Sequence, residues 1–224
     1  AVLSVEASTA AAQSLTLEDD PLRKQFASRP AGELEGLTSK VEFWTVEGKK
    51  SVYLTVNFVR VSGIVSGQLV VIERPVEFFV PAGQRDEGQQ WISSNMRLLS
   101  MVARSGASIS KALANMCEVV WDKGPVRCGF VTREDGAQAP RFHDSEVAAI
   151  GYALQQILAR RGFLDSLGNQ VPVAALARRL AARDQASTEA TFPGRLAAAT
   201  AQAGVANSNL TNVANLSSGK KCPE

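Results

Sequence analysis

The feature that most limits the fold is a stretch in which apolar and polar side chains alternate. Residues 51–61 place Val52, Leu54, Val56 and Phe58 on one side of an extended chain, and Tyr53, Thr55 and Asn57 on the other. A period of two residues is typical of a strand with one buried face. A sheet built from such strands needs a second layer on its apolar side.

Three more segments have strand chemistry: Val41–Val46, Leu69–Ile72 and Pro75–Val80. The connection Glu47–Lys50 is typical of a hairpin between the first of them and residues 51–61. Pro75 has no amide hydrogen to donate to a neighbouring strand, so it favours an edge strand or the start of a strand. We therefore predict a small antiparallel sheet over about residues 40–80.

The covering layer is predicted from apolar residues at helical spacing. The clearest segment, Ser108–Gly162, indicates a helix, a bend, a short strand at 126–132 and a second helix. Asp144 or Ser145 is a candidate cap at the start of that second helix, and Gly162 is a candidate left-handed cap at its end. Helices are expected over residues 87–104, 108–120, 145–161 and 172–183. The predicted fold class is α+β, a small antiparallel sheet covered by three to four helices.

Changes in composition divide the chain into three parts. Residues 1–39 are an N-terminal arm with a short helix at Asp20–Phe26, and residues 40–184 form the α+β domain. Residues 185–224 are rich in Ala, Ser, Thr and Asn, and Phe192 is their one aromatic residue. Such a segment buries too little apolar surface to offset the entropy lost on ordering, so we predict a disordered, flexible tail.

Composition argues against several classes of function. The 224 residues are 45% hydrophobic, and a formal net charge of +2 is too small to predict a nucleic-acid partner. We expect neither a membrane span nor a secretory signal. Three irregularly spaced cysteines favour a reducing compartment, so we predict a cytoplasmic protein. A single histidine leaves little scope for histidine-based catalysis or zinc binding.

The cysteines and the histidine are the candidate reactive groups. Cys222 follows two lysines near the end of the tail, where exposure and positive charge favour the thiolate, although an incidental terminal cysteine is the alternative. Cys117 and Cys128 are expected to pack in the core. His143 precedes a helix start and is either an acid–base group or a loop residue; we favour the loop residue. No phosphate-binding loop is evident.

Four strings of residues resemble one family: Ile72–Pro81, Arg104–Ile109, Trp121–Gly129 and His143–Gly151. They are similar to the C-terminal part, called the TSCPD domain, of adenosylcobalamin-dependent (class II) ribonucleotide reductases. The similarity is greatest to the split form found in pseudomonads, in which this part is a separate small subunit. It covers roughly residues 40–180 and the tail.

The resemblance implies an accessory subunit of a vitamin B12-dependent enzyme that reduces ribonucleotides to deoxyribonucleotides for DNA replication. Adenosylcobalamin would belong to the catalytic large subunit, so this chain would bind no cofactor and would not be active alone. Cys222 matches the first cysteine of a mobile pair that re-reduces the active-site disulfide and is itself reduced by a thioredoxin-type protein. A tail of about 35 residues has a root-mean-square reach of about 30 Å, enough for such transfer.

The sequence departs from this family in two places. The second cysteine of the tail pair does not occur, so we expect the native tail to continue beyond Glu224. The Thr-Ser-Cys-Pro-Asp string that names the domain does not occur either. Arg127-Cys128-Gly129 occupies a comparable place only loosely, so no role is carried over to Cys128.

An accessory subunit needs a surface for its partner, and exposed aromatic residues are the natural candidates. We expect Trp44, Tyr53 and Phe79 on the far faces of the strands, together with Trp121 in the bend, to contact the large subunit.

Two other functions remain open from the sequence. A non-catalytic nucleic-acid or regulatory binding module is the alternative that the pairs Arg160-Arg161 and Arg178-Arg179 indicate weakly. Nucleic-acid affinity that survives physiological salt would favour it. A free-standing thiol oxidoreductase would need a second cysteine within reach of Cys222.

Overall fold

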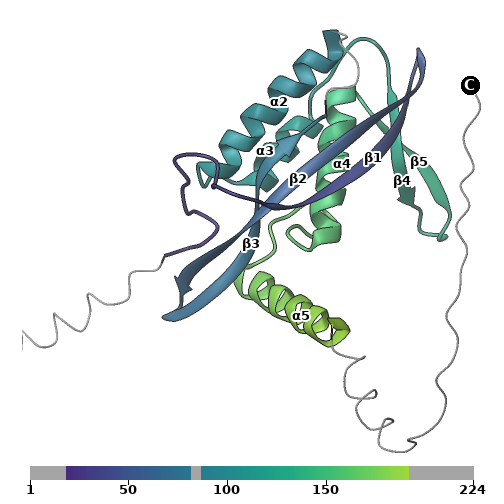
Figure 1. Ribbon diagram of the computed structural model, residues 1–224. Helices are drawn as coiled ribbons and strands as arrows, with labels where there is room; N and C mark the ends of the chain where they lie inside the picture. Colours follow the sequence, from purple (N-terminus) through teal and green to yellow (C-terminus); the bar gives the residue numbers. More distant parts are fainter. Residues whose placement is uncertain (1–18, 82–86, 192–224) are drawn as a thin grey trace, which may run out of the picture. The chain divides into compact units, whose positions relative to one another are not determined.

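The computed structural model describes residues 19–81 and 87–191 (Figure 1). The described residues up to Arg183 belong to one compact unit. It has one five-stranded antiparallel sheet with helices packed against it, so the α+β prediction is confirmed. The elements in chain order are β1 Glu35–Thr45, β2 Gly48–Val65, β3 Gln68–Phe79, α2 Glu87–Arg104, α3 Ile109–Cys117, β4 Val126–Thr132, β5 Gln138–His143, α4 Glu146–Arg161 and α5 Val173–Thr191.

The strands lie in the order β3-β2-β1-β4-β5. Strands β1, β2 and β3 are consecutive antiparallel neighbours and account for the sheet predicted over residues 40–80. The hairpin β4–β5 joins the sheet beside β1, where Trp44 pairs with Arg127. The strand β5 was not predicted, and β1 begins at Glu35, inside the predicted N-terminal arm.

The alternation in β2 decides which face of the sheet is buried. Leu54, Val56 and Phe58 are buried, and Val52 packs against the same core, whereas Tyr53 is exposed. We call the helix-covered side the inner face and the opposite side the outer face. The helices contribute these buried residues to the core: Met96 and Leu99 of α2, Leu113 of α3, and Ile150, Leu154, Ile157 and Leu158 of α4.

Polar caps fix the ends of α4. The hydroxyl of Ser145 accepts a hydrogen bond from the Ala148 amide at 3.0 Å and donates to the Val119 carbonyl at 2.6 Å, so Ser145 rather than Asp144 is the cap. Gly162 ends the helix with φ 88°, the left-handed conformation that was predicted there.

Helix α2 closes the outer edge of β3. The Ser100 hydroxyl accepts from the Phe78 amide at 2.9 Å, and the Arg104 guanidinium donates to the Val76 carbonyl at 3.4 Å. Pro75 lies in this edge strand, next to a register shift at Asn57/Phe58, as its missing amide hydrogen predicts.

The short helix predicted at Asp20–Phe26 is wrong. Residues 21–23 form a turn in which the Asp20 carboxylate accepts from the Leu22 amide at 2.9 Å. The buried guanidinium of Arg74 donates to the carbonyls of Pro21 at 3.1 Å and Lys24 at 2.7 Å, and also to that of Ala103. Because Arg74 binds these carbonyls, they do not serve as acceptors in a helix.

The β2–β3 hairpin extends past the end of β1. Its residues 61–72 include no charged side chain, and Ile64, Leu69 and Val71 are exposed. Asp19 forms a two-way backbone bridge with Ile64, at 3.0 and 2.9 Å. The segment at residues 19–26 therefore covers part of this hairpin.

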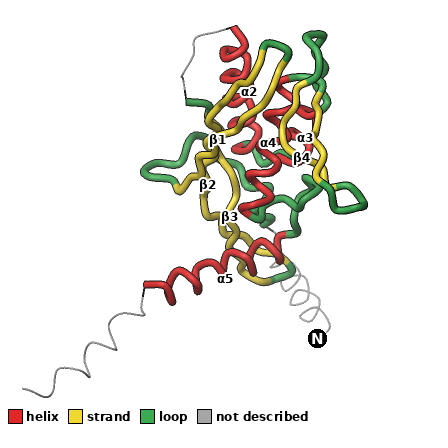
Figure 2. The backbone as a smooth tube through the Cα atoms, turned by 90° about the vertical axis from the view of Figure 1, so that its right-hand side faces the viewer, coloured by secondary structure: helices red, strands yellow, loops and turns green. Residues whose placement is uncertain are grey.

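A charge cluster joins β3 to α4 and α5. The Glu73 carboxylate accepts from Arg161 at 2.7 Å and from Arg183 at 2.6 and 2.9 Å. Burial would raise the pKa of Glu73, but the hydrogen bonds from both guanidinium groups outweigh burial and lower it to about 2. In Figures 1 and 2, the start of α5 lies near the lower part of β3.

The last helix is longer than predicted. Helix α5 continues through residues 185–191, where the sequence predicted the start of the tail. Cys222 and the rest of the predicted tail lie outside the described residues.

Candidate partner-binding surface

The outer face of the sheet presents three of the four aromatic residues predicted to contact a partner. Trp44 is 36% exposed, Tyr53 52% and Phe79 43%. Each stands on the side of its strand opposite to the core residues that adjoin it, as the two-residue period requires. Within the described residues, the helices that supply the buried core pack on the inner face.

The centre of this surface is a cross-strand row that we call the Trp44 row. Phe142 of β5, Arg127 of β4, Trp44 of β1 and Lys49 of β2 are successive register partners. The Arg127 guanidinium lies 4.3 Å from the centroid of the Trp44 ring, and the Lys49 ammonium lies 5.4 Å from it. Because the two cations belong to the strands on either side of β1, the indole ring stands between them.

Glu42 balances the lysines beside this row. Its carboxylate pairs with Lys40 at 3.1 Å and with Lys49 at 2.7 Å, and hydrogen bonds from Lys49 and Lys40 lower the pKa of Glu42. Tyr53 is the register partner of Lys40. Arg127 has no carboxylate partner within the described residues. It is therefore the uncompensated cation of the row.

Two phenylalanines that the sequence did not single out extend the surface. Phe130 pairs in register with Pro140, two residues before Phe142 in β5, so both rings are on the outer face. Phe130 is 63% exposed and Phe142 62%. The signal in the sequence is weak, because Pro140 interrupts the β5 pattern and the register of β4 shifts between Arg127 and Phe130.

The opposite end of the outer face is closed. Asn57 donates to the Glu77 carboxylate at 3.1 Å, and Arg29 donates to the same carboxylate at 2.8 Å. Gly36 adjoins this pair, and a Cβ atom there would stand 2.2 Å from the Asn57 side-chain oxygen. The side chains thus leave no room for a larger residue at this end.

Trp121 is not brought onto the sheet face. It lies in the loop between α3 and β4, donates from its backbone amide to the Asp144 carbonyl at 3.0 Å, and is 41% exposed. Gly124 of the same loop approaches Val46 in the β1–β2 turn. The structure therefore places Trp121 in a loop at the end of the sheet, whereas Trp44, Tyr53 and Phe79 stand on strands.

The cysteines and the histidine of the domain are structural. Cys128 is only 4% exposed and belongs to the core, as expected, whereas Cys117 is half-buried and lies outside the core clusters. Burial raises the pKa of both thiols. His143 ends β5 rather than lying in a loop, so that expectation is wrong. Its Nε2 donates to the Cys128 carbonyl at 3.1 Å, and burial lowers its pKa. These groups form no nucleophile–base pair.

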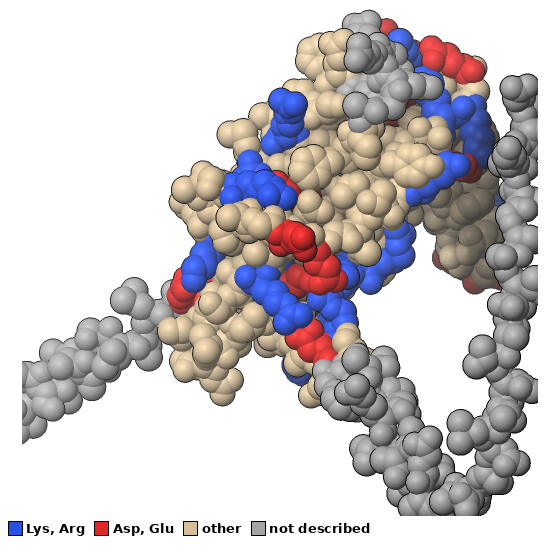
Figure 3. Space-filling view, in the orientation of Figure 1, with Lys and Arg blue, Asp and Glu red and all other residues tan. Residues whose placement is uncertain are grey.

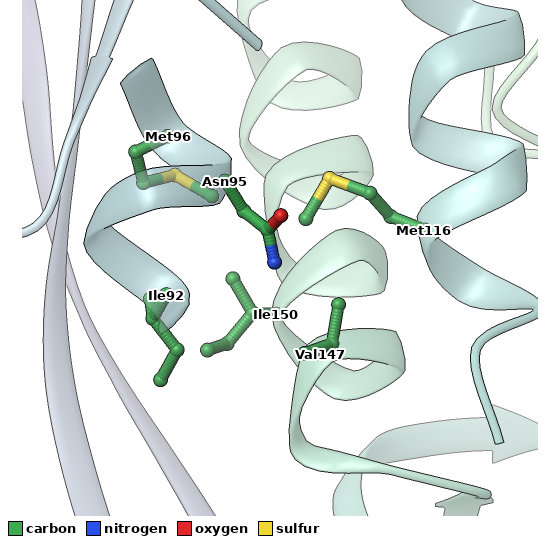
Figure 4. Close-up of a pocket in the computed structure, with 6 residues that line it drawn as sticks. All are labelled: Ile92, Asn95, Met96, Met116, Val147 and Ile150. Carbon is green, nitrogen blue, oxygen red and sulfur yellow. The ribbon is translucent and has the colours of Figure 1, made fainter. Parts of the chain in front are cut away.

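A small hollow between α2, α3 and α4 is lined by apolar side chains and one amide (Figure 4). Asn95 points into it between Ile92 and Met116. The lining holds no acid, base or nucleophile, so it offers no catalytic chemistry. The six lining residues are Ile92, Asn95, Met96, Met116, Val147 and Ile150.

Other classes of site are not found in the part of the chain that the structure describes. No cluster of His, Cys, Asp and Glu side chains there is suited to a metal ion, and no helix there is both long and apolar enough to cross a membrane. Figure 3 shows basic and acidic side chains interspersed among uncharged surface. The visible face has no extended field of one sign.

The comparisons with known proteins give no further guide. Protein-family models, curated proteins and solved structures were compared with the chain, and none of them matches it.

Proposed function

We propose that this chain is an accessory subunit of an adenosylcobalamin-dependent ribonucleotide reductase and docks on the catalytic large subunit through its outer sheet face. The observation that supports this best is the Trp44 row, where aromatic rings and cations are exposed on a face that the described helices leave open. Clustered Trp, Tyr and Arg side chains are typical of protein interfaces.

The four strings that resemble the family are spread over the whole domain. They lie on β3, at the junction of α2 and α3, on the loop and strand that contain Arg127, and at the start of α4. Since the described cysteines are structural, the chemistry of reduction and the adenosylcobalamin would belong to the partner. We expect the complex in the cytoplasm, where protein thiols are kept reduced.

Cys222 is proposed to carry the reducing equivalents. Its thiolate attacks one sulfur of the large-subunit disulfide, which forms a mixed disulfide and releases the other sulfur as a thiolate. A thioredoxin-type dithiol then attacks the Cys222 sulfur and releases the second large-subunit thiolate. The second thiol of the reductant resolves the remaining mixed disulfide and regenerates Cys222. The net result is transfer of two electrons and two protons from the dithiol to the large-subunit disulfide.

Reconstitution with a class II large subunit tests this function. Cys222→Ser is expected to abolish multiple turnover with a thioredoxin-type reductant but to retain turnover with a small dithiol, which enters the active site directly. Cys117→Ser is the matched control and should behave like the wild-type chain with both reductants. Normal turnover of the Cys222→Ser subunit with the protein reductant would show that the chain is only a scaffold and transfers no reducing equivalents.

The alternative, a nucleic-acid binding module, has less support. Among the arginines that motivated it, Arg161 pairs with Glu73 at 2.7 Å, and Arg179 donates to the Gly162 carbonyl at 2.6 Å. Both side chains thus make contacts within the domain. The Trp44 ring also lies between two cations, which leaves less of its faces open for base stacking.

A further inference from the structure

Beside the outer-face aromatic residues, the edges of the sheet are poorly suited to pairing with a partner strand. Helix α2 occupies backbone groups of β3 through Ser100 and Arg104, on one edge of the sheet. On the other edge, β5 is only six residues long and contains Pro140, which has no amide hydrogen. A partner that binds this sheet is therefore expected to contact side chains on its outer face rather than add a strand.

The side chains of the Trp44 row define what such a partner must present. Arg127 stacks on the Trp44 ring, which restricts the guanidinium to a narrow range of positions. Its planar fork of N–H groups matches a carboxylate, and within the described residues no acidic side chain occupies it. Lys49 on the other side of the ring is already paired with Glu42 at 2.7 Å.

The surroundings of Arg127 are apolar on the β5 side. Its register partner there is Phe142, and Phe130 lies on the same face one register pair further along. Both rings are more than half exposed. An ion pair formed at Arg127 would thus be flanked by aromatic surface that excludes water and strengthens it.

We infer that the Trp44 row binds a protein segment that presents a carboxylate between apolar side chains, with the carboxylate on Arg127 and the apolar groups on Phe142 and Phe130. This inference rests on the proposed function, in which the segment belongs to the catalytic large subunit. It adds the chemistry of the contact, which the docking proposal leaves open.

The test is the dissociation constant of the complex between the full chain and a class II large subunit. Arg127→Glu is expected to weaken the complex at least about 30-fold, because it places two carboxylates together in the interface. Arg97→Glu on α2 makes the same charge change on an exposed residue away from the outer face, and it should leave the constant within about twofold. If Arg127→Glu lowers the melting temperature, the dissociation constant is measured with the neutral Arg127→Gln variant instead. This variant is expected to bind the large subunit about tenfold more weakly.

The outcomes separate this inference from the proposed function. If the wild-type chain binds the large subunit and neither Arg127→Glu nor Arg127→Gln changes the dissociation constant, the inference is overturned but the docking proposal stands. A wild-type chain that binds no large subunit overturns the docking proposal, and the inference with it. A third measurement uses an oligo-dT strand at physiological salt: tight binding that Arg127→Glu removes would overturn the inference in favour of a nucleic-acid partner.

Discussion

The two faces of the sheet carry opposite kinds of side chain, although the same strands build both. On the inner face, Leu54 and Val56 are fully buried against helices. On the outer face, Tyr53 and Trp44 remain exposed beside charged residues. The inner face therefore supplies the core that stabilises the fold. The outer face exposes aromatic rings that the core does not use. Substitutions of adjacent residues in one strand separate these two roles.

The largest expected effect is on the inner face. Leu54→Ala should lower the free energy of unfolding by about 3 kcal/mol, because it removes buried methyl groups and leaves a cavity. Tyr53→Ala, one residue away, should lower it by less than about 1 kcal/mol, since the ring is half exposed. Urea denaturation followed by circular dichroism measures both values. Equal losses for the two variants would contradict the assignment of the faces.

The Glu73 cluster gives the next effect, and it depends on pH. The pKa of Glu73 is about 2 in the folded chain against 4.5 for the free side chain, so its contribution is present above about pH 4.5 and is lost as the pH falls toward 2. The shift corresponds to at most about 3 kcal/mol. Between these pH values, the free energy of unfolding of Glu73→Gln should therefore fall much less than that of the wild-type chain. Unfolding measured at several pH values checks this, and an unchanged pH dependence would contradict it.

The smallest effects on stability, and the clearest on binding, are expected on the outer face. Trp44→Ala should weaken the complex with the large subunit roughly 10- to 100-fold, because Trp side chains dominate interfaces of this kind. Trp121→Ala should change it less than about threefold, since Trp121 stands on the α3–β4 loop and not on a strand of the outer face. Calorimetric titration measures both constants. A larger loss for Trp121 would place the interface on the loop instead of the sheet.

The inner face could be predicted from the sequence because its signals are local. Alternation within residues 51–61 identifies the buried side of β2, and the helical spacing from Val147 to Leu158 identifies the buried side of α4. The cap at Gly162 follows from the residue type alone. Each of these patterns depends on neighbours within one element, so no knowledge of the tertiary structure is needed.

The outer face could be predicted only in part. The sequence indicates that Trp44 and Tyr53 point away from the core, but it does not show that Arg127 stacks on Trp44, because the two residues are far apart in the chain and meet only through strand order. The N-terminal turn was mistaken for a helix for a similar reason. The carbonyls of Pro21 and Lys24 are taken by Arg74, a residue of a distant strand.

The bridge between Asp19 and Ile64 has a consequence for how the protein is made. Residues 61–72 form an uncharged hairpin with exposed Ile64, Leu69 and Val71, a composition that favours aggregation between nascent chains. The segment that pairs with it, residues 19–26, leaves the ribosome before the hairpin does. The backbone of Asp19 is thus available to pair with Ile64 as soon as the hairpin emerges, so the order of synthesis shortens the time for which this strand edge is open to other chains.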